Sequence, residues 1–308
     1  MKKFAALVLA GAMTLGLAAC GGGNTSTPAA SSTPATSTPA ASTGSDYASL
    51  DPVVLRGADS AGVGAAAQQL GELVAEKVDA ITGGQLTVEY YPNSEMGGDM
   101  DIQQQMLDGT LDYVVLQTAP TVSFVPAVAV FDLPMVFAQY DGDTIDQVLN
   151  GDDSEFLKAI APKYEEKNMK ILGYLQNATY RLTTSNVKLD TLDAFKGLQI
   201  RTMENQNHMA FWSALGAAPT PLAWPEVYIS LQNGTIDAQE NAADTCMTSN
   251  FQEVQKYLNF TNHILYLNQI IINNDKFNSL DPLYQDALTQ AVEEAIAELR
   301  PALTELDK

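Results

Sequence analysis

Residues 197–241 read GLQIRTMENQNHMAFWSALGAAPTPLAWPEVYISLQNGTIDAQEN, and this stretch decides the fold class. Its predicted elements are a strand over 198–202, a helix over 205–215, a short helix over 225–232 and, after the turn at Gly234, a strand that contains Asp237. Strands that alternate with helices on this scale indicate an α/β fold with mostly parallel strands.

The same alternation continues on both sides of this stretch. The predicted strands are 53–58, 86–91, 111–116 and 169–175, and the predicted helices are 64–80, 99–107, 156–167 and 282–299. The chain from residue 47 onward is long enough to bury a large core and would suit two lobes.

The N-terminus has the pattern of a secretory signal. Two lysines follow Met1, and the apolar run over 4–19 is shorter than the about 20 residues that a transmembrane helix needs. Residues 17–20 read Leu-Ala-Ala-Cys, which is the lipobox pattern of bacterial lipoproteins. We therefore expect a signal peptide over 1–19 and lipid on Cys20, with an ordinary signal and an incidental cysteine as the alternative. Residues 20–46 are rich in Ser, Thr, Pro and Ala and are expected to form an extended tether.

Charge and composition exclude several classes of function. The formal net charge is −21, and it becomes −23 when the two lysines of the predicted signal are removed. Nucleic acids and anionic membranes both require a basic face that such a chain lacks. Cys246 has no partner if Cys20 carries lipid, so a disulfide framework is excluded. No metal-ligand spacing and no glycine-rich phosphate loop is present, so we expect neither an enzyme nor a cofactor or metal site.

Positive charge is scarce along the chain, and two arginines are candidate anchors for an anion. No Lys or Arg occurs over 78–157 or over 202–255. Arg201 ends a predicted strand, and Arg181 lies just before another one. Open α/β sheets bind ligands near strand ends, and Arg can hold a carboxylate with two parallel hydrogen bonds. Position alone equally allows surface arginines that pair with the many acidic residues.

The motifs of the opening stretch, taken in order, resemble a known family. The motifs are Gly197–Arg201, Leu215–Pro221, Trp224–Tyr228, Leu231–Gly234 and Asp237–Asn241. Further matches are Thr82–Gly84, Tyr91-Pro92, Gly109–Asp112, Phe131–Pro134, Glu253–Tyr257 and Thr261–His263. Together they resemble the solute-binding proteins of TRAP (tripartite ATP-independent periplasmic) transporters of the dicarboxylate-binding (DctP) type. The resemblance covers about residues 53–295.

This resemblance implies a fold, a function and partners. The implied fold is the two-lobed periplasmic-binding-protein-like fold (type II), with a ligand cleft between the lobes and a long connecting helix. One lobe would take residues 47–178 plus 267–308, and the other would take 179–266. The implied function is extracytoplasmic capture of a small organic acid for the membrane permease of a TRAP transporter. A ligand-sensing module for a membrane receptor and, further off, an extracytoplasmic enzyme on the same scaffold are the alternatives.

The resemblance also implies which residues bind the ligand. Arg201 would hold the ligand carboxylate, and Arg181, twenty residues earlier, would be the second arginine. Trp224 would stack on the ligand body, and Asn241 would donate to the acid group. The positions expected to face the ligand's polar tail from the other lobe are Asp59, Ser60, Asp99 and Gln117.

The chain departs from the family pattern at two places. Ala242 stands where the family often has a proline, which implies a looser turn there. The sequence ends at Lys308, short of the last helices that the family usually adds, so weaker bracing of the hinge is expected.

The lipobox pattern generates the first prediction. Cys20→Ala removes the thiol that would carry lipid, so the variant should appear in the soluble fraction or stay unprocessed. Membrane fractionation followed by immunoblotting measures this. A variant that sediments with membranes as the wild type does would contradict lipid attachment at Cys20.

Overall fold

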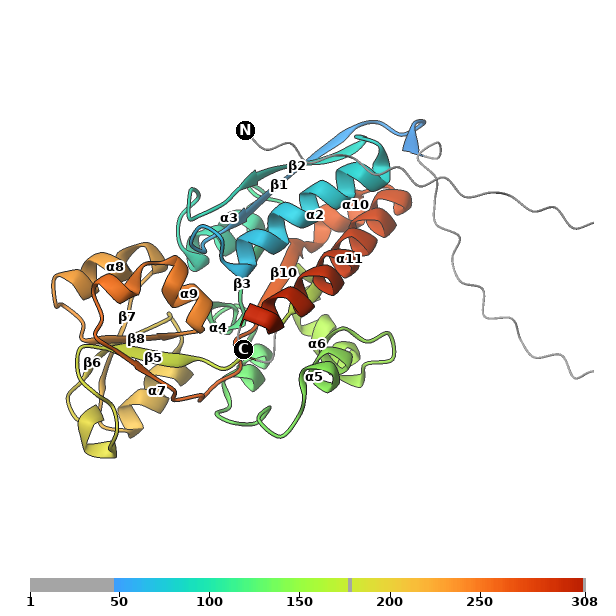
Figure 1. The fold of residues 1–308 in the computed structure, drawn as a ribbon. Helices are drawn as coiled ribbons and strands as arrows, with labels where there is room; N and C mark the ends of the chain where they lie inside the picture. The colour runs from blue at the N-terminus through green and yellow to red at the C-terminus, as the bar shows by residue number, and fades with distance from the viewer. Residues whose placement is uncertain (1–46, 177–178, 307–308) are drawn as a thin grey trace, which may run out of the picture. The chain divides into compact units, whose positions relative to one another are not determined.

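The computed structural model describes residues 47–176 and 179–306, in which the strands form two five-stranded sheets (Figure 1). The predicted signal peptide, Cys20 and the whole of the predicted tether lie outside the described residues. The first sheet has the strand order β2 (Leu86–Tyr91), β1 (Val53–Asp59), β3 (Tyr113–Gln117), β10 (Asn268–Asn273) and β4 (Met169–Leu175). The second has the order β7 (Ala218–Pro221), β6 (Gln199–Thr202), β8 (Ala238–Asn241), β5 (Leu182–Ser185) and β9 (Tyr257–Asn259).

The expectation of mostly parallel strands is confirmed for four of the five strands in each sheet, whereas one strand in each sheet runs against its neighbours. In the first sheet β1 is parallel to β2 and β3, whereas β10 is antiparallel to β3 and β4. In the second sheet β6 is parallel to β7 and β8, whereas β5 is antiparallel to β8 and β9. The reversed strands are β10 and β5, and each is the first strand after the chain crosses from the other sheet. Each therefore begins at the edge of its sheet where the parallel strands end.

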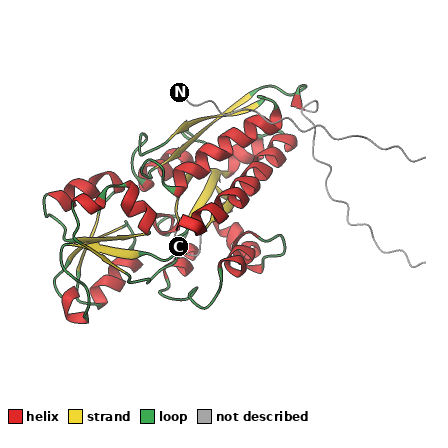
Figure 2. Ribbon diagram, viewed as in Figure 1, coloured by secondary structure: helices red, strands yellow, loops and turns green. Residues whose placement is uncertain are grey.

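Helices flank the strands of both sheets (Figure 2). The α-helices are α2 (Ala66–Thr82), α3 (Asp99–Leu107), α4 (Thr118–Thr121), α5 (Gly142–Asn150), α6 (Glu155–Glu165), α7 (Gln206–Ala214), α8 (Trp224–Gln232), α9 (Ala243–Thr248), α10 (Asn274–Ser279) and α11 (Pro282–Leu306). Short 3-10 helices are η1 (Pro126–Asp132), η2 (Leu192–Phe195) and η3 (Phe251–Glu253). No helix in the described part of the chain is long and apolar enough to cross a membrane.

The longest described helix, α11 with 25 residues, packs along α2 and on β4 of the first sheet (Figure 1). Two chain segments pass between the sheets, and they are hydrogen bonded to each other. The backbone N–H of Arg181 donates to Ile264 O at 2.8 Å, and the N–H of Tyr266 donates to Thr179 O at 2.8 Å. These paired segments carry Arg181 and Tyr266 to the place where the two sheets meet.

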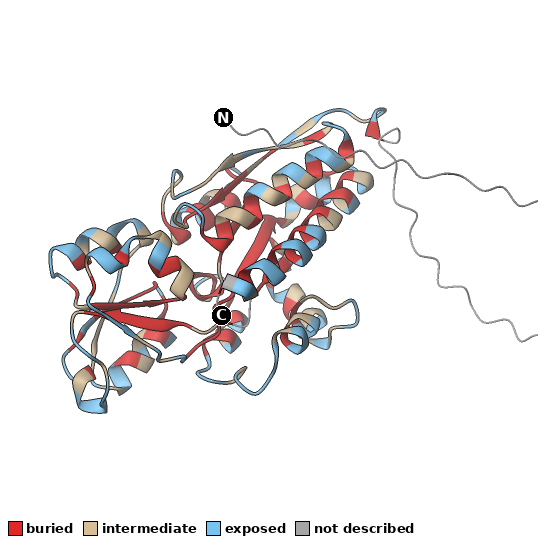
Figure 3. Ribbon diagram, viewed as in Figure 1, coloured by how far each residue is buried: buried red, intermediate tan, exposed pale blue. Residues whose placement is uncertain are grey.

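Alternating side chains of the first sheet fill two cores (Figure 3). Tyr113 and Val115 of β3 pack in the core under α2 and α11. Val114 and Leu116 pack on the opposite face, in the core that α3, α5 and α6 cover. Side chains of a strand point to opposite faces in turn, so a strand buried on both faces is apolar at every position.

The second sheet also has two cores, which are smaller. Val227 of α8 and Cys246 of α9 belong to one of them, and Ile200 of β6 and Trp212 of α7 belong to the other. Cys246 is a free, buried cysteine whose Sγ accepts a hydrogen bond from Gln239 Nε2 at 3.2 Å.

A close approach between α2 and β2 fixes the end of β1. A Cβ atom on Gly71 would stand 1.9 Å from the Oη of Tyr90, so only glycine leaves room for that ring. The Tyr90 hydroxyl donates to Asp59 Oδ2 at 2.8 Å, and Asp59 Oδ1 accepts from the backbone N–H of Ala61 at 2.8 Å. Hydrogen bonds from Tyr90 and from Ala61 to the Asp59 carboxylate therefore fix the chain where it leaves β1 through Ser60.

The glycine generates the second prediction. Inside an exposed helix Gly→Ala gains up to about 1 kcal/mol, but overpacking a filled site costs about 1–3 kcal/mol. Gly71→Ala should therefore lower the free energy of unfolding, measured by urea denaturation. Glu76→Ala on the exposed side of α2 is the control and should change it by less than about 0.5 kcal/mol. A Gly71→Ala protein as stable as the wild type would contradict the tight contact with Tyr90.

Candidate functional site

A narrow cavity lies where the ends of strands from both sheets come together. Its free room is about 20 Å³, which is enough for roughly one water molecule. The polar and aromatic residues of its lining are Ser60, Asp99, Gln117, Arg201, Trp224, Thr245, Tyr266 and Asn268. Because the lining comes from both sheets and leaves so little room, the structure shows a closed arrangement.

Topology explains why these residues meet. β1 and β3 are parallel, so Ser60 and Gln117 lie at the same edge of the first sheet. Arg201 lies near the corresponding end of β6 in the second sheet. The reversed strand β10 begins at this edge with Asn268. Ligand sites of open α/β sheets occur at the carboxyl ends of parallel strands, which is where this cavity lies.

Arg201 is a buried cation that has no carboxylate partner in the described part of the chain. Its side chain is 2% exposed, and its Nε and Nη2 both donate to Leu222 O, at 2.9 and 2.7 Å. Its Nη1 is buried without a hydrogen-bond partner. Burial lowers the pKa of Arg201 to about 10 although Glu240 and Asp99 act against that change, so the guanidinium stays charged at neutral pH. A buried unpaired charge is costly, and an anion at Nη1 would relieve that cost.

Trp224 supports this guanidinium. The Arg201 Cζ lies 5.5 Å from the centre of the Trp224 ring, and that ring is 5.5 Å from the ring of Phe251. A cation over an indole face gains electrostatic attraction in a dry site. Trp224 also lines the cavity, so stacking on a ligand stays a prediction for it.

Arg181, in contrast, is neutralised. Its Nη1 forms an ion pair with Glu240 Oε2 at 2.7 Å, and both side chains are buried. Its Nη2 donates to Gln117 Oε1 and contacts Met203 Sδ at 3.0 Å. Arg181 therefore positions Gln117 at the cavity while Glu240 balances its charge. Sequence analysis missed Glu240, although an acidic residue inside a predicted strand was a signal that its charge needed a partner.

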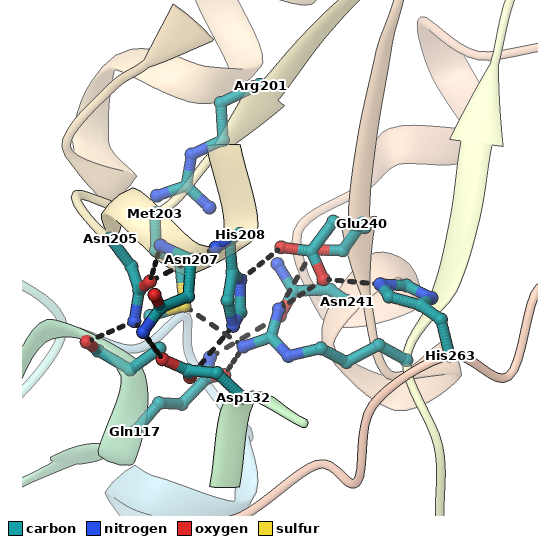
Figure 4. A network of polar contacts seen from close by, with 12 residues as sticks. Gln117, Asp132, Arg201, Met203, Asn205, Asn207, His208, Glu240, Asn241 and His263 are labelled. Carbon is teal, nitrogen blue, oxygen red and sulfur yellow. Dashed lines mark hydrogen bonds and ion pairs between the residues drawn. The ribbon is translucent and has the colours of Figure 1, made fainter. Parts of the chain in front are cut away.

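Glu240 is the centre of a buried polar network (Figure 4). His263 Nε2 lies 3.3 Å from Glu240 Oε2, and His208 Nδ1 lies 3.6 Å from Glu240 Oε1. Burial disfavours the charge of Glu240, but Arg181 and the two histidines outweigh it and hold the pKa of Glu240 well below its usual range. The place of His263 beside Glu240 is consistent with a structural role for this residue.

The network connects elements of both sheets through Asp132, the last residue of η1. Asp132 Oδ2 accepts from the side-chain amides of Asn205 at 2.8 Å and Asn207 at 2.9 Å. Asp132 Oδ1 lies 3.2 Å from His208 Nε2, and Asn205 also donates to Ala119 O at 2.8 Å (Figure 4). Helix α7 of the second sheet is thereby held to η1 and α4 of the first. Arg201 lies apart from these contacts in Figure 4.

The other predicted site residues fall into two groups. Ser60, Asp99 and Gln117 line the cavity. Asn241 is fully buried behind Gln117, whose Nε2 donates to Asn241 Oδ1 at 3.4 Å. Asp59 is not part of the lining, since its carboxylate accepts from Tyr90 and from backbone N–H groups instead.

Two further features of the sequence analysis concern this region. Ala242, where the resembled family often has proline, is fully buried with φ −69°, the value that a proline ring would impose. The described residues contain no group of three His, Cys, Asp or Glu side chains that could hold a metal ion.

The fold has two sheets flanked by helices, and the strand ends of both sheets enclose a buried, unpaired arginine. This arrangement is that of a solute-binding protein. The model of the bacterial extracellular solute-binding protein family 7 (DctP) matches residues 58–308, and the chain belongs to this family. The 2,3-diketo-L-gulonate-binding periplasmic protein of Escherichia coli is 31% identical over 230 residues, which are 75% of this chain and 67% of the relative. The family is extracytoplasmic, and its members are solute-binding proteins.

Solved structures of the same kind share the two-lobed fold. The sugar acid binding protein of Advenella mimigardefordensis in complex with galactonate has a TM-score of 0.77 and 28% identity, covering 84% of this chain and 81% of that one. A TRAP periplasmic solute-binding protein of Shewanella oneidensis with bound succinate has a TM-score of 0.77 and 26% identity, covering 83% and 82%.

The position of His208 between two carboxylates generates the third prediction. Burial alone would lower its pKa, but Asp132 and Glu240 outweigh burial and raise it above 6.5. A group with a raised folded pKa stabilises the fold below its unfolded pKa, and that contribution is lost as the pH rises through the folded pKa. The loss of unfolding free energy caused by His208→Gln should therefore be largest below about pH 6.5 and should shrink above it.

His263 provides the matched contrast. Burial lowers the pKa of His263, so His263→Gln should have the opposite pH trend, with the wild type losing its advantage as the pH falls. Denaturant unfolding at a series of pH values measures both variants. A His208→Gln effect that does not vary with pH would contradict the charged bridge between Asp132 and Glu240.

Proposed function

We propose that this protein captures a small organic acid outside the cytoplasm and delivers it to the membrane permease of a TRAP transporter. The observation that carries the proposal is the buried Arg201, whose Nη1 has no partner and which lines a cavity formed by both sheets. Membership of the family and the acids bound by its structural relatives, galactonate and succinate, support the same function.

In this proposal the ligand carboxylate binds at Arg201. Leu222 O fixes the guanidinium through Nε and Nη2, which leaves Nη1 as the open donor. Gln117, held by Arg181, is the second donor group near the carboxylate. Arg181 itself acts through Gln117 and stays paired with Glu240. Trp224 covers the bound acid and excludes water, which strengthens the ion pair.

Capture requires the two sheets to separate and close again. The cavity has room for roughly one water molecule, so an acid cannot enter the arrangement described here. Contacts such as those of Asp132 with Asn205 and Asn207 would break and re-form in each cycle. A ligand that contacts residues of both sheets stabilises the closed state by its differential affinity for that state.

The site is proposed to work close to the membrane. Lipid on Cys20 would anchor the protein, and the Ser, Thr, Pro and Ala-rich residues 20–46 would let the binding domain reach the permease. The Leu-Ala-Ala-Cys pattern at 17–20 supports the anchor.

Arg201 generates the fourth prediction. Removing one partner of a buried charge pair typically costs roughly 2–5 kcal/mol. Arg201→Ala should therefore weaken acid binding about 30-fold to several thousand-fold. Arg201→Lys keeps the charge but loses the fork geometry, so it should also weaken binding. Isothermal titration calorimetry with galactonate as the probe measures both effects.

The control for this prediction is Arg300→Ala. Arg300 lies on α11, pairs with Asp143 and does not line the cavity. Arg300→Ala removes the same charge from the chain as Arg201→Ala and should leave the affinity for acids unchanged. An Arg201→Ala variant that is folded and binds acids as the wild type does would contradict the carboxylate site.

A further inference from the structure

We propose that the site selects acids with a single carboxylate whose other end donates hydrogen bonds, and that Asp99 makes it reject dicarboxylates. The inference rests on the proposed function and deepens it by naming the class of acid. The donor on the ligand is a hydroxyl or an ammonium group.

The charges of the cavity lining can balance one ligand carboxylate. Among the described residues that line the cavity, Arg201 is the one cation and Asp99 is the one carboxylate. Arg181 stands behind Gln117, but Glu240 cancels its charge through the ion pair of 2.7 Å. One open cation can neutralise one carboxylate, and a second carboxylate on the ligand would find no cation of its own.

Asp99 provides the carboxylate of the cavity lining. It is the first residue of α3, and its Oδ1 accepts a hydrogen bond from Ser60 Oγ. In the described part of the chain no Lys, Arg or His lies within ion-pair distance of it. An ionised carboxylate only accepts hydrogen bonds, so it attracts a hydroxyl or ammonium group and repels a second carboxylate.

Burial raises the pKa of Asp99 above its usual range, although the hydrogen bond from Ser60 and the charges of Arg201 and Arg181 oppose that rise. The lining thus offers a dianion one open cation, Arg201, and places the carboxylate of Asp99 against its second charge.

The lining also includes a residue with an unused hydrogen-bond acceptor. Asn268, the first residue of β10, lines the cavity and is 2% exposed, yet its Oδ1 has no hydrogen-bond partner. Buried acceptors are nearly always satisfied, and a donor group on the ligand would satisfy this one. The lining thus combines Arg201 and Asn268, which each have a buried polar atom without a hydrogen-bond partner, with the carboxylate of Asp99.

Matched acids test the proposal. Galactonate and galactarate have the same six-carbon chain and differ only at C6, which is a hydroxyl in one and a carboxylate in the other. Calorimetry on the wild type should find galactonate bound at least roughly tenfold more tightly, as expected for one hydrogen bond to a charged group. Galactarate bound as tightly as galactonate would overturn the selectivity and leave the proposed function standing.

A pair of variants assigns the effect to Asp99. Asp99→Asn keeps the shape of the side chain and an acceptor for Ser60 but removes the charge, so the preference for galactonate should shrink by about tenfold or more. Asp101→Asn is the matched control, because Asp101 lies two residues further along α3, is exposed and does not line the cavity. A preference that is unchanged in Asp99→Asn, or equally reduced in Asp101→Asn, would contradict the role of Asp99.

A four-carbon series identifies the donor. Tighter binding of 4-aminobutyrate than of 4-hydroxybutyrate assigns an ammonium group to Asp99, and the reverse order assigns a hydroxyl. Succinate bound more tightly than both would overturn the proposal. Failure of all the acids to bind the wild type would contradict the proposed function itself, and the inference with it.

Discussion

The buried charge of Arg201 is the constraint on which the rest of the site depends. A guanidinium removed from water is costly unless an anion or oriented dipoles compensate for it. This chain provides a carbonyl oxygen at Leu222 and an indole face at Trp224, but no carboxylate within ion-pair distance in the part that the structure describes. Arg181 carries an equal charge a short way off, and there Glu240 compensates fully. The contrast between the two arginines leaves one place in the cavity where an acid gains free energy by binding.

The topology of the sheets brings the remaining groups to that place. Parallel strands deliver Ser60, Gln117 and Arg201 at their carboxyl ends, and the reversed strand β10 adds Asn268 from the opposite chain direction. Without the reversal, β10 would present its other end and the acceptor at Asn268 would be lost. Asp132 then connects elements of both sheets through Asn205, Asn207 and His208.

The sequence predicted the fold class from local periodicity, and it singled out Arg201 as a candidate whose ligand role came from the family resemblance. Arg201 stood out because it ends a short strand and begins a long stretch without cations, and most strands and helices showed their periodicity. Partners distant along the chain had no such signal: His208 and Asp132 are 76 residues apart, and Arg181 and Glu240 are 59 apart. The antiparallel direction of β5 and β10 was missed because it follows from where the chain returns. Asp59 was expected in the site, but Tyr90, 31 residues away, occupies its carboxylate.

The central claim is that the ligand carboxylate replaces the missing partner of Arg201. A crystal structure of the protein with the tightest-binding acid of the calorimetric series tests it most directly. The account predicts a carboxylate oxygen within about 3 Å of Arg201 Nη1, as charge-assisted hydrogen bonds require, with Arg181 still paired to Glu240. A carboxylate bound at Arg181 in place of Glu240, or one that leaves Arg201 Nη1 without a partner, would contradict it.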